Sequence, residues 1–315
     1  MIIGTVYKST GSWYLVKSEK GIFHKCKIQG KFRIKGIKST NPIAVGDKVS
    51  FFLEKIGDEE IGIIKTIHDR QNFIARKSVN LSKQIQIIAA NIDVVFLLIT
   101  IDNPPTFTTF IDRFLVTTRA YRIDTVLVFN KMDAYEIEQK AEVLYLRDIY
   151  EAIGYQCVKV SATQGKNIDV LKEIMHKKTS MFVGHSGVGK STLVNAIEPT
   201  LHLKTKQISE QHRQGQHTTT FAEMHTLSSG GYIIDTPGIR AFGLVDLEKE
   251  HYAHYFPEMR ALLGECRFNN CKHLNEPHCA VKASVENQAI APHRYQTYLQ
   301  LMHEDSSDPY RRSEF

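Results

Sequence analysis

The stretch SMFVGHSGVGKSTLVNAI, residues 180–197, has the pattern of a phosphate-binding strand, loop and helix. Residues 180–183 predict a strand, residues 192–197 predict a helix, and GHSGVGKS at 184–191 fits GxxxxGK[ST]. The glycines let backbone N–H groups face the phosphates, the lysine adds a positive charge, and the final hydroxyl can bind Mg²⁺. The predicted phosphate-binding residues are Gly184, His185, Ser186, Gly187, Val188, Gly189, Lys190, Ser191 and Thr192.

Strands and helices alternate on the N-terminal side of this stretch. Strands are expected at 94–100, 125–129 and 155–160, and helices at 107–121, 136–153 and 168–175. Such alternation is typical of a mostly parallel sheet in an α/β domain. Ligands of these sheets lie at the carboxyl ends of the strands, so the loops after Phe129, Val160 and Val183 are the expected binding loops.

The tetrapeptide Asn130-Lys131-Met132-Asp133 follows the strand at 125–129 and matches the guanine-reading pattern NKxD. Guanine presents its N1–H and 2-amino hydrogens side by side, and the Asp133 carboxylate can accept both, whereas adenine has no such donor pair. Asn130 is expected to tie this loop to the phosphate loop, and the Lys131 stem is expected to lie over the base. The pattern therefore favours GTP and GDP over adenine nucleotides.

Two shorter motifs extend the guanine-nucleotide set. SAT at 161–163 resembles the SAx element, in which a backbone amide meets the guanine O6, and we assign this role to Ser161 and Ala162. DTPG at 235–238 follows an apolar strand at 232–234 and matches DxxG. Asp235 is expected to hold Mg²⁺ through water, and the Gly238 amide is expected to contact the γ-phosphate.

The motifs come in an unusual order. GQHTTT at 215–220 lies where a GTPase carries its switch I Mg²⁺ ligand, which we assign to Thr219 with Thr218 and Thr220 open as alternatives. GTPases normally run phosphate loop, switch I, DxxG, NKxD, SAx, but here NKxD and SAx come first. Rejoining the ends of a compact α/β domain and opening a new break keeps the pocket intact. We therefore predict a circularly permuted GTPase domain over residues 69–243.

Residues 1–68 have a different pattern, with period-two alternation in five short strands. These are expected at 2–8, 13–17, 22–28, 48–54 and 61–67, with turn residues between them. Five strands in this length predict a small closed barrel. The OB-type barrel is a common module of this size, and it often binds RNA.

The positive charge of the chain is concentrated in this N-terminal region. Residues 1–40 carry nine lysines and arginines against Glu19 alone, a net charge of +8 in a chain whose total is +6. This positive electrostatic field favours the binding of nucleic acid. A basic surface that only faces solvent is an equal alternative. Trp13, Tyr14, Phe23 and Phe32 could stack on bases, although for each single ring a place in the barrel core is favoured.

A Cys/His cluster follows the predicted GTPase domain. Cys266, Cys271, His273 and Cys279 have the spacing C-x4-C-x-H-x5-C, which supplies three thiolates and an imidazole for a complete tetrahedral Zn²⁺ shell. No ligand position would stay open, so the site should be structural. The isolated Cys26 and Cys157 are expected to be buried. The third domain, residues 244–315, is expected to be mostly helical.

Composition and the N-terminus indicate where the chain works. The 315 residues are 42% hydrophobic and 23% charged, which is ordinary for a globular protein. No signal-peptide pattern is present, and no apolar run reaches the ~18 residues that a membrane span requires. We expect a cytoplasmic monomer without a membrane partner.

Together the barrel, the permuted motifs NKMD, SAT, GHSGVGKS, GQHTTT and DTPG, and the zinc spacing resemble the RsgA family, also called YjeQ or YloQ. The resemblance covers nearly the whole chain. It implies a bacterial GTPase that acts in late maturation of the small ribosomal subunit. It also implies contacts with ribosomal RNA from both flanking domains, and low intrinsic GTPase activity that the subunit stimulates.

One departure from ordinary GTPases bears on mechanism. Ile239 follows Gly238, where many GTPases keep a glutamine that orients the attacking water, and an aliphatic side chain cannot do this. His217 is the catalytic candidate, which the resemblance supports; fixing its own loop or contacting RNA is an equal alternative. Gln216 stands where relatives often have a basic residue, so its part in RNA contact stays open.

Two other functions compete with a ribosome assembly GTPase. An RNA-binding module could keep GTP as a structural ligand only, since the usual glutamine is missing. Turnover with and without small subunits separates this reading from an enzyme. An ATP-dependent enzyme is disfavoured by Asp133, and nucleotide competition tests it.

Overall fold

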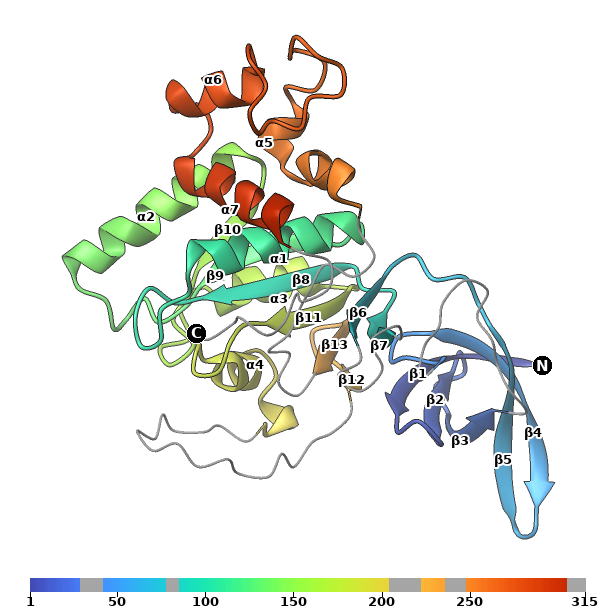
Figure 1. Ribbon diagram of the computed structural model, residues 1–315. Helices are drawn as coiled ribbons and strands as arrows, with labels where there is room; N and C mark the ends of the chain where they lie inside the picture. Colours follow the sequence, from blue (N-terminus) through green and yellow to red (C-terminus); the bar gives the residue numbers. More distant parts are fainter. Residues whose placement is uncertain (29–41, 78–84, 204–221, 236–247, 305–315) are drawn as a thin grey trace.

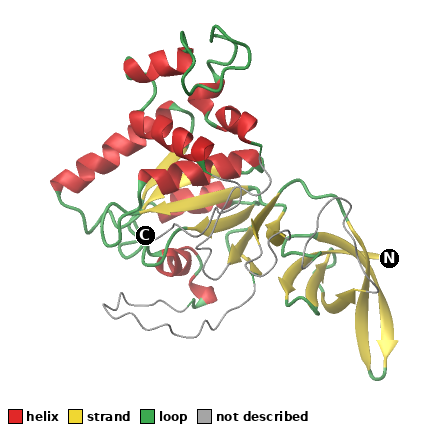
Figure 2. Cartoon of the chain, in the orientation of Figure 1, coloured by secondary structure: helices red, strands yellow, loops and turns green. Residues whose placement is uncertain are grey.

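The computed structural model describes residues 1–28, 42–77, 85–203, 222–235 and 248–304, and it contains a barrel, a sheet covered by helices and a helical C-terminal region (Figure 1, Figure 2). The strands are β1 (Ile2–Ser9), β2 (Tyr14–Ser18), β3 (Phe23–Ile28), β4 (Lys48–Ile56), β5 (Glu59–Ile67), β6 (Phe73–Lys77), β7 (Ile85–Ala90), β8 (Val94–Ile99), β9 (Asp124–Phe129), β10 (Gln156–Lys159), β11 (Thr179–Val183), β12 (Glu223–Thr226) and β13 (Tyr232–Asp235). The helices are α1 (Thr108–Ala120), α2 (Ile137–Ala152), α3 (Ile168–Met175), α4 (Lys190–Ile197), α5 (Pro257–Arg260), α6 (Ala280–Glu286) and α7 (Pro292–His303), with 3₁₀ turns η1 (Pro199–Leu201) and η2 (Lys249–Tyr255).

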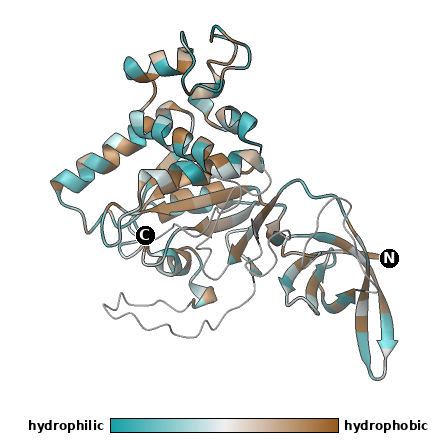
Figure 3. Cartoon of the chain, viewed as in Figure 1, coloured by the Kyte–Doolittle hydropathy of each residue, from teal (hydrophilic) through white to brown (hydrophobic). Residues whose placement is uncertain are grey.

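The first five strands close into a barrel, which confirms the predicted fold of this region. Strand β1 pairs antiparallel with both β2 and β4, β3 pairs with β2 and in parallel with β5, and β4 with β5 completes the ring. Alternate side chains, among them Val6, Val16 and Phe51, face inward and form the barrel core. The β4–β5 hairpin extends beyond the barrel, and the tip of β4 is hydrophilic (Figure 3).

Two aromatic rings lie outside the barrel core, so our expectation for them was wrong. Tyr14 is 1% exposed and fills the core, but Trp13 and Phe23 are 36% and 49% exposed. Strand alternation is the reason: Cys26 is buried on β3, so Phe23, three residues before it, is on the opposite, outer face. Trp13 likewise precedes the inward Tyr14. Phe32 lies outside the described residues.

The central sheet has the strand order β10-β9-β8-β11-β13-β12. Neighbours pair in parallel except β12, which is antiparallel to β13. The predicted mostly parallel sheet is therefore confirmed. The β12 strand also pairs with β1 of the barrel through Lys8 and Glu223, so one continuous run of strands joins the barrel to the sheet.

Helices cover both faces of this sheet. On β8, Val95, Leu97 and Ile99 face the core formed with α1 and α2, whereas Val94, Phe96 and Leu98 face the core formed with α3 and α4. All six residues of β8 are buried, which explains why its sequence is continuously apolar rather than alternating. The strands at the centre of Figure 3 are accordingly hydrophobic.

A two-stranded hairpin, β6–β7, was not foreseen from the sequence. Its residues Ala75 and Ile87 pack against Ala44, and the Ala90 N–H donates to the Val45 carbonyl at 2.9 Å. The hairpin fills the junction between barrel and sheet, where it is held by tertiary contacts. Short alternating segments such as IQI at 85–87 carry no signal of that location.

The C-terminal region packs on α1 through buried charges. Arg294 of α7 donates to Asp112 of α1 at 2.9 Å and to Glu258 of α5 at 2.7 Å, and Arg294 and Asp112 are fully buried. The Tyr150 hydroxyl of α2 also donates to Asp112, at 2.7 Å. Removing one partner would leave the other charge buried and unpaired, so substitutions in this network should be strongly destabilising.

No strand occurs among the described residues beyond 248, which agrees with the mostly helical region expected there. In the described parts of the chain, no helix combines the length and the apolar character needed to cross a bilayer. The domain limits at 68 and 243 stay predictions, and residue 243 itself lies outside the described residues.

Candidate functional site

The predicted phosphate loop connects β11 to α4 at the carboxyl end of the sheet. Gly189, directly before α4, has a φ of +93°, a region that favours glycine. A Cβ on Gly189 would lie 2.5 Å from the Asn130 Nδ2, a clash with a buried side chain. Both its backbone conformation and its neighbour therefore require glycine at this position.

Asn130 joins the guanine-reading loop to the phosphate loop. It follows β9 and is 1% exposed, and its Nδ2 donates to the Val188 carbonyl at 2.8 Å. Its Oδ1 accepts the Ala162 N–H at 3.4 Å, so one buried amide contacts both the 161–163 and the 184–191 segments. The two loops that a single nucleotide would have to bridge are thus adjacent.

Asp133 is an oriented, exposed carboxylate at this site. Ser161 Oγ donates to its Oδ1 at 2.5 Å, and Thr163 Oγ1 donates to its Oδ2 at 2.9 Å. The Ser161 hydrogen bond, ahead of all other causes, lowers the pKa of Asp133, so the carboxylate stays ionised into mildly acidic solution. An ionised, pre-oriented carboxylate is the acceptor that the guanine N1–H and 2-amino groups require.

The lysine of the phosphate loop lies near the aspartate of DxxG. Burial lowers the pKa of Lys190, and the negative charge of Asp235 opposes this shift. The sheet explains their proximity, because β13 ends at Asp235 and pairs in parallel with β11, which leads into the phosphate loop. A cationic group and a carboxylate at this point suit phosphates with Mg²⁺.

Three of the predicted site residues, His217, Thr219 and Gly238, lie outside the described residues, as does Ile239. The roles assigned to them stay predictions. The chain before their segment is anchored, since Asn195 exchanges two hydrogen bonds with Leu203 at 2.8 Å each.

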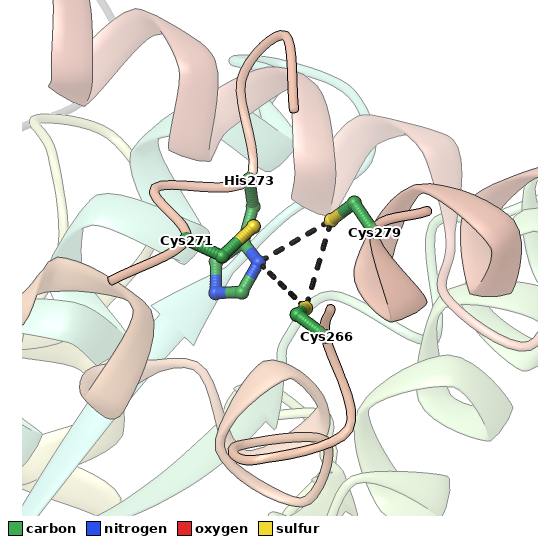
Figure 4. Close-up of side chains that lie close together, drawn as sticks. All are labelled: Cys266, Cys271, His273 and Cys279. Atoms are coloured by element: carbon green, nitrogen blue, oxygen red, sulfur yellow. Dashed lines mark hydrogen bonds between the residues drawn. The ribbon is translucent and has the colours of Figure 1, made fainter. Parts of the chain in front are cut away.

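The structure brings Cys266, Cys271, His273 and Cys279 together, with all four ligand atoms within 4.8 Å of one another (Figure 4). The Sγ atoms of Cys266 and Cys279 are 3.9 Å apart, and His273 Nδ1 lies 3.6 and 3.4 Å from them. Sulfurs ~2.3 Å from a central tetrahedral ion would be about 3.8 Å apart. The cluster therefore has the dimensions of a tetrahedral metal site.

Aromatic residues of α7 hold the loop that carries these ligands. The Tyr295 hydroxyl donates to the His273 carbonyl at 2.7 Å, and the Tyr298 hydroxyl donates to the Lys272 carbonyl at 2.6 Å. Burial lowers the pKa of His273, which favours the neutral imidazole that binds metals. The loop is thus fixed from outside the ligand set, as expected for a structural centre.

Sequence reasoning missed two parts of the site. Thr163 contacts Asp133 directly but was not assigned a role, although it stands in the SAT motif. The 100–107 loop, which follows β8, contacts both the guanine-reading loop and the phosphate loop through Lys131 and His185. The sequence could have indicated this loop, because ligands bind at the carboxyl ends of parallel strands, and this rule applies to the loop after β8 as it does to the loops after β9 and β11.

The fold and the site define a P-loop GTPase whose guanine-nucleotide motifs come in circularly permuted order, between an N-terminal barrel and a C-terminal region with a metal-type Cys/His cluster. Profiles of known families agree with this class. The profile described as RsgA GTPase matches residues 67–245, and the RsgA N-terminal domain profile matches residues 3–64. The chain belongs to the RsgA GTPase family.

Individual relatives extend over nearly the whole chain. A protein of Flavobacterium johnsoniae named small ribosomal subunit biogenesis GTPase RsgA is 62% identical over 302 residues, which are 96% of this chain and 93% of that protein. A protein of the same name from Christiangramia forsetii is 61% identical over 312 residues, 99% of both.

Two solved structures show the same architecture. The crystal structure of YjeQ from Thermotoga maritima has a TM-score of 0.76 and 36% identity and covers 96% of this chain and 97% of its own. The structure of YloQ, described as a circularly permuted GTPase, has a TM-score of 0.72 and 30% identity and covers 96% of this chain and 94% of its own. The permuted order of the motifs in this chain agrees with the description of YloQ as circularly permuted.

Proposed function

We propose that this chain hydrolyses GTP during biogenesis of the small ribosomal subunit, in the cytoplasm and as a monomer, with that subunit as its partner. The observation that carries the nucleotide assignment is the Asn130 amide, which joins the guanine-reading loop to the phosphate loop at 2.8 Å. The near-complete match to relatives named small ribosomal subunit biogenesis GTPase supports the partner.

Each described segment has a task in GTP binding. Asp133, oriented by Ser161 and Thr163, accepts the two guanine hydrogens, and the Ala162 amide meets O6. Backbone N–H groups of residues 184–191 and the Lys190 ammonium bind the phosphates. Ser191, Asp235 and Thr219 are the proposed Mg²⁺ partners, of which Asp235 acts through water. When bound, Mg²⁺ neutralises charge that develops on the phosphates.

The barrel offers a surface for ribosomal RNA. Lys25 Nζ lies 4.4 Å from the Trp13 ring centroid, and Lys17 Nζ lies 5.4 Å from the Phe23 centroid. Exposed rings with adjacent cations are suited to stacking on bases while the charges attract phosphates. The exposure of Trp13 and Phe23 favours this reading over a merely solvated basic face.

The Cys/His cluster is proposed to hold one structural Zn²⁺. Three cysteines and one histidine would fill the tetrahedral shell, and the ligand spacing fits the size of such a site. Zn²⁺ then supplies folding free energy to the C-terminal region and has no part in hydrolysis.

The decisive experiment is GTP hydrolysis titrated with purified small subunits. We expect slow turnover alone and an increase of at least about tenfold with small subunits, because a partner can supply or position groups that stabilise the transition state. Large subunits at equal concentration and the Lys190→Ala protein are the controls. Equal stimulation by large subunits would reject the partner, and GTP binding without turnover under any condition would favour GTP as a structural ligand.

Ile239 cannot orient water, so we propose His217 for this task. We expect His217→Ala to reduce subunit-stimulated turnover about 100-fold, as for loss of a group that positions the attacking water, with GDP affinity unchanged within about threefold. His202→Ala, at an exposed position just before the same segment, is the matched control. Full stimulated turnover in the His217→Ala protein would exclude the catalytic role.

A further inference from the structure

The 100–107 loop, which joins β8 to α1, contacts the guanine-reading loop. Lys131 Nζ donates to the carbonyl of Asn103, and the Ile101 N–H donates to the Tyr135 hydroxyl at 2.9 Å. Asp102 adds a negative charge close to Lys131. The lysine expected to lie over the guanine base is therefore held by this loop.

The same loop contacts the phosphate loop on its other side. Thr106 Oγ1 and His185 Nε2 share a hydrogen bond of 2.8 Å. A Cβ on Gly187 would lie 3.1 Å from the ring Cδ of Pro104, so the phosphate loop passes close to this proline ring. The His185 ring also packs edge-on against Phe110 at the start of α1, with centroids 6.1 Å apart.

Internal hydrogen bonds fix the shape of the 100–107 loop. The Thr106 N–H donates to the Thr100 carbonyl at 2.7 Å, and the Thr100 N–H donates to Thr106 Oγ1 at 3.1 Å. The Thr100 hydroxyl donates to the Pro104 carbonyl, and Thr106 is buried. A short loop closed in this way transmits a displacement at one end to the other.

We propose that the 100–107 loop is a third nucleotide-positioning loop, which sets the separation between the guanine-reading loop and the phosphate loop, and that Thr106 is its positioning residue on the phosphate side. Thr106 acts through His185 and Lys131 acts through Asn103, so base and phosphates are held at one fixed spacing. Such pre-organisation raises affinity because less freedom is lost on binding. The inference rests on the proposed nucleotide function.

The test measures GDP affinity by calorimetry in single variants. Thr106→Val removes one hydroxyl at nearly constant volume and should weaken GDP binding about tenfold, the usual effect of losing a buried hydrogen-bond partner. Thr106→Ser restores the hydroxyl and should bind within about twofold of the wild type. Thr125→Val is the matched control, because it removes a buried hydroxyl that bonds Thr118, at 2.8 Å, away from this loop.

A double-variant cycle separates positioning from a general structural role. Lys131→Met removes the contact on the guanine side. If one loop couples both ends, the loss of GDP affinity caused by Thr106→Val should be at least about threefold smaller in the Lys131→Met background than in the wild type. The inference would be overturned if the double variant loses GDP affinity by the product of the two single losses, within about twofold. Wild-type GDP affinity in Thr106→Val would also overturn it. A wild-type chain that binds no GDP would instead overturn the proposed function.

Discussion

Asp133→Asn is expected to abolish guanine selectivity. The change replaces an ionised acceptor with an amide, so two charge-assisted hydrogen bonds worth ~1.5–3 kcal/mol each are lost and GTP affinity should fall roughly 10²–10⁴-fold. Xanthosine triphosphate, which carries a carbonyl in place of the 2-amino group, should gain affinity because the amide can donate to it. Competition binding with GTP, ATP and xanthosine triphosphate measures these changes.

The matched control is Asp169→Asn, at a carboxylate on α3 that is 95% exposed and pairs with Lys172 of the same helix. It changes the net charge equally and should leave all three affinities unaltered. Because the Ser161 hydrogen bond lowers the pKa of Asp133, GTP binding by the wild type should also persist in mildly acidic buffer. GTP binding by Asp133→Asn at the wild-type level would remove this carboxylate from base recognition.

Removal of the metal is expected to unfold the C-terminal region. Structural Zn²⁺ sites contribute about 10–16 kcal/mol, which matches or exceeds the ~5–15 kcal/mol of a typical whole-domain stability. Chelation, or Cys279→Ser, should therefore raise amide exchange across residues 248–304 while barrel strands such as β1 stay protected. Metal analysis of the wild type should give about one zinc per chain.

Cys157→Ser is the control for this experiment, since it removes a partly buried thiol outside the cluster. It should keep both its zinc and its exchange pattern. Well under one zinc per chain in freshly purified wild type, or unchanged exchange after complete chelation, would contradict a structural zinc centre. The first result would reject the metal, and the second would show that Arg294 and its acidic partners hold the region without it.

The sequence predicted the barrel, the mostly parallel sheet and the helical C-terminal region, because each rests on a local pattern. Period-two alternation, continuous apolar strands and 3.6-residue periodicity are repeated along the chain and need no knowledge of neighbours. The β6–β7 hairpin was missed for the opposite reason: its strands are short, and Ala75 and Ile87 are buried only where the barrel meets the sheet.

The expected chemistry of this protein can be inferred from local motifs, since binding a guanine, a phosphate or a metal requires particular residue types at fixed spacing. Which of these residues meet depends on the packing of the folded chain. Asn130 reaches Val188 across 58 residues, and Arg294 reaches Asp112 across 182, because separate strands and helices pack there. The outward rings of the barrel and the bridging 100–107 loop also depend on packing between distant elements, which no local pattern encodes.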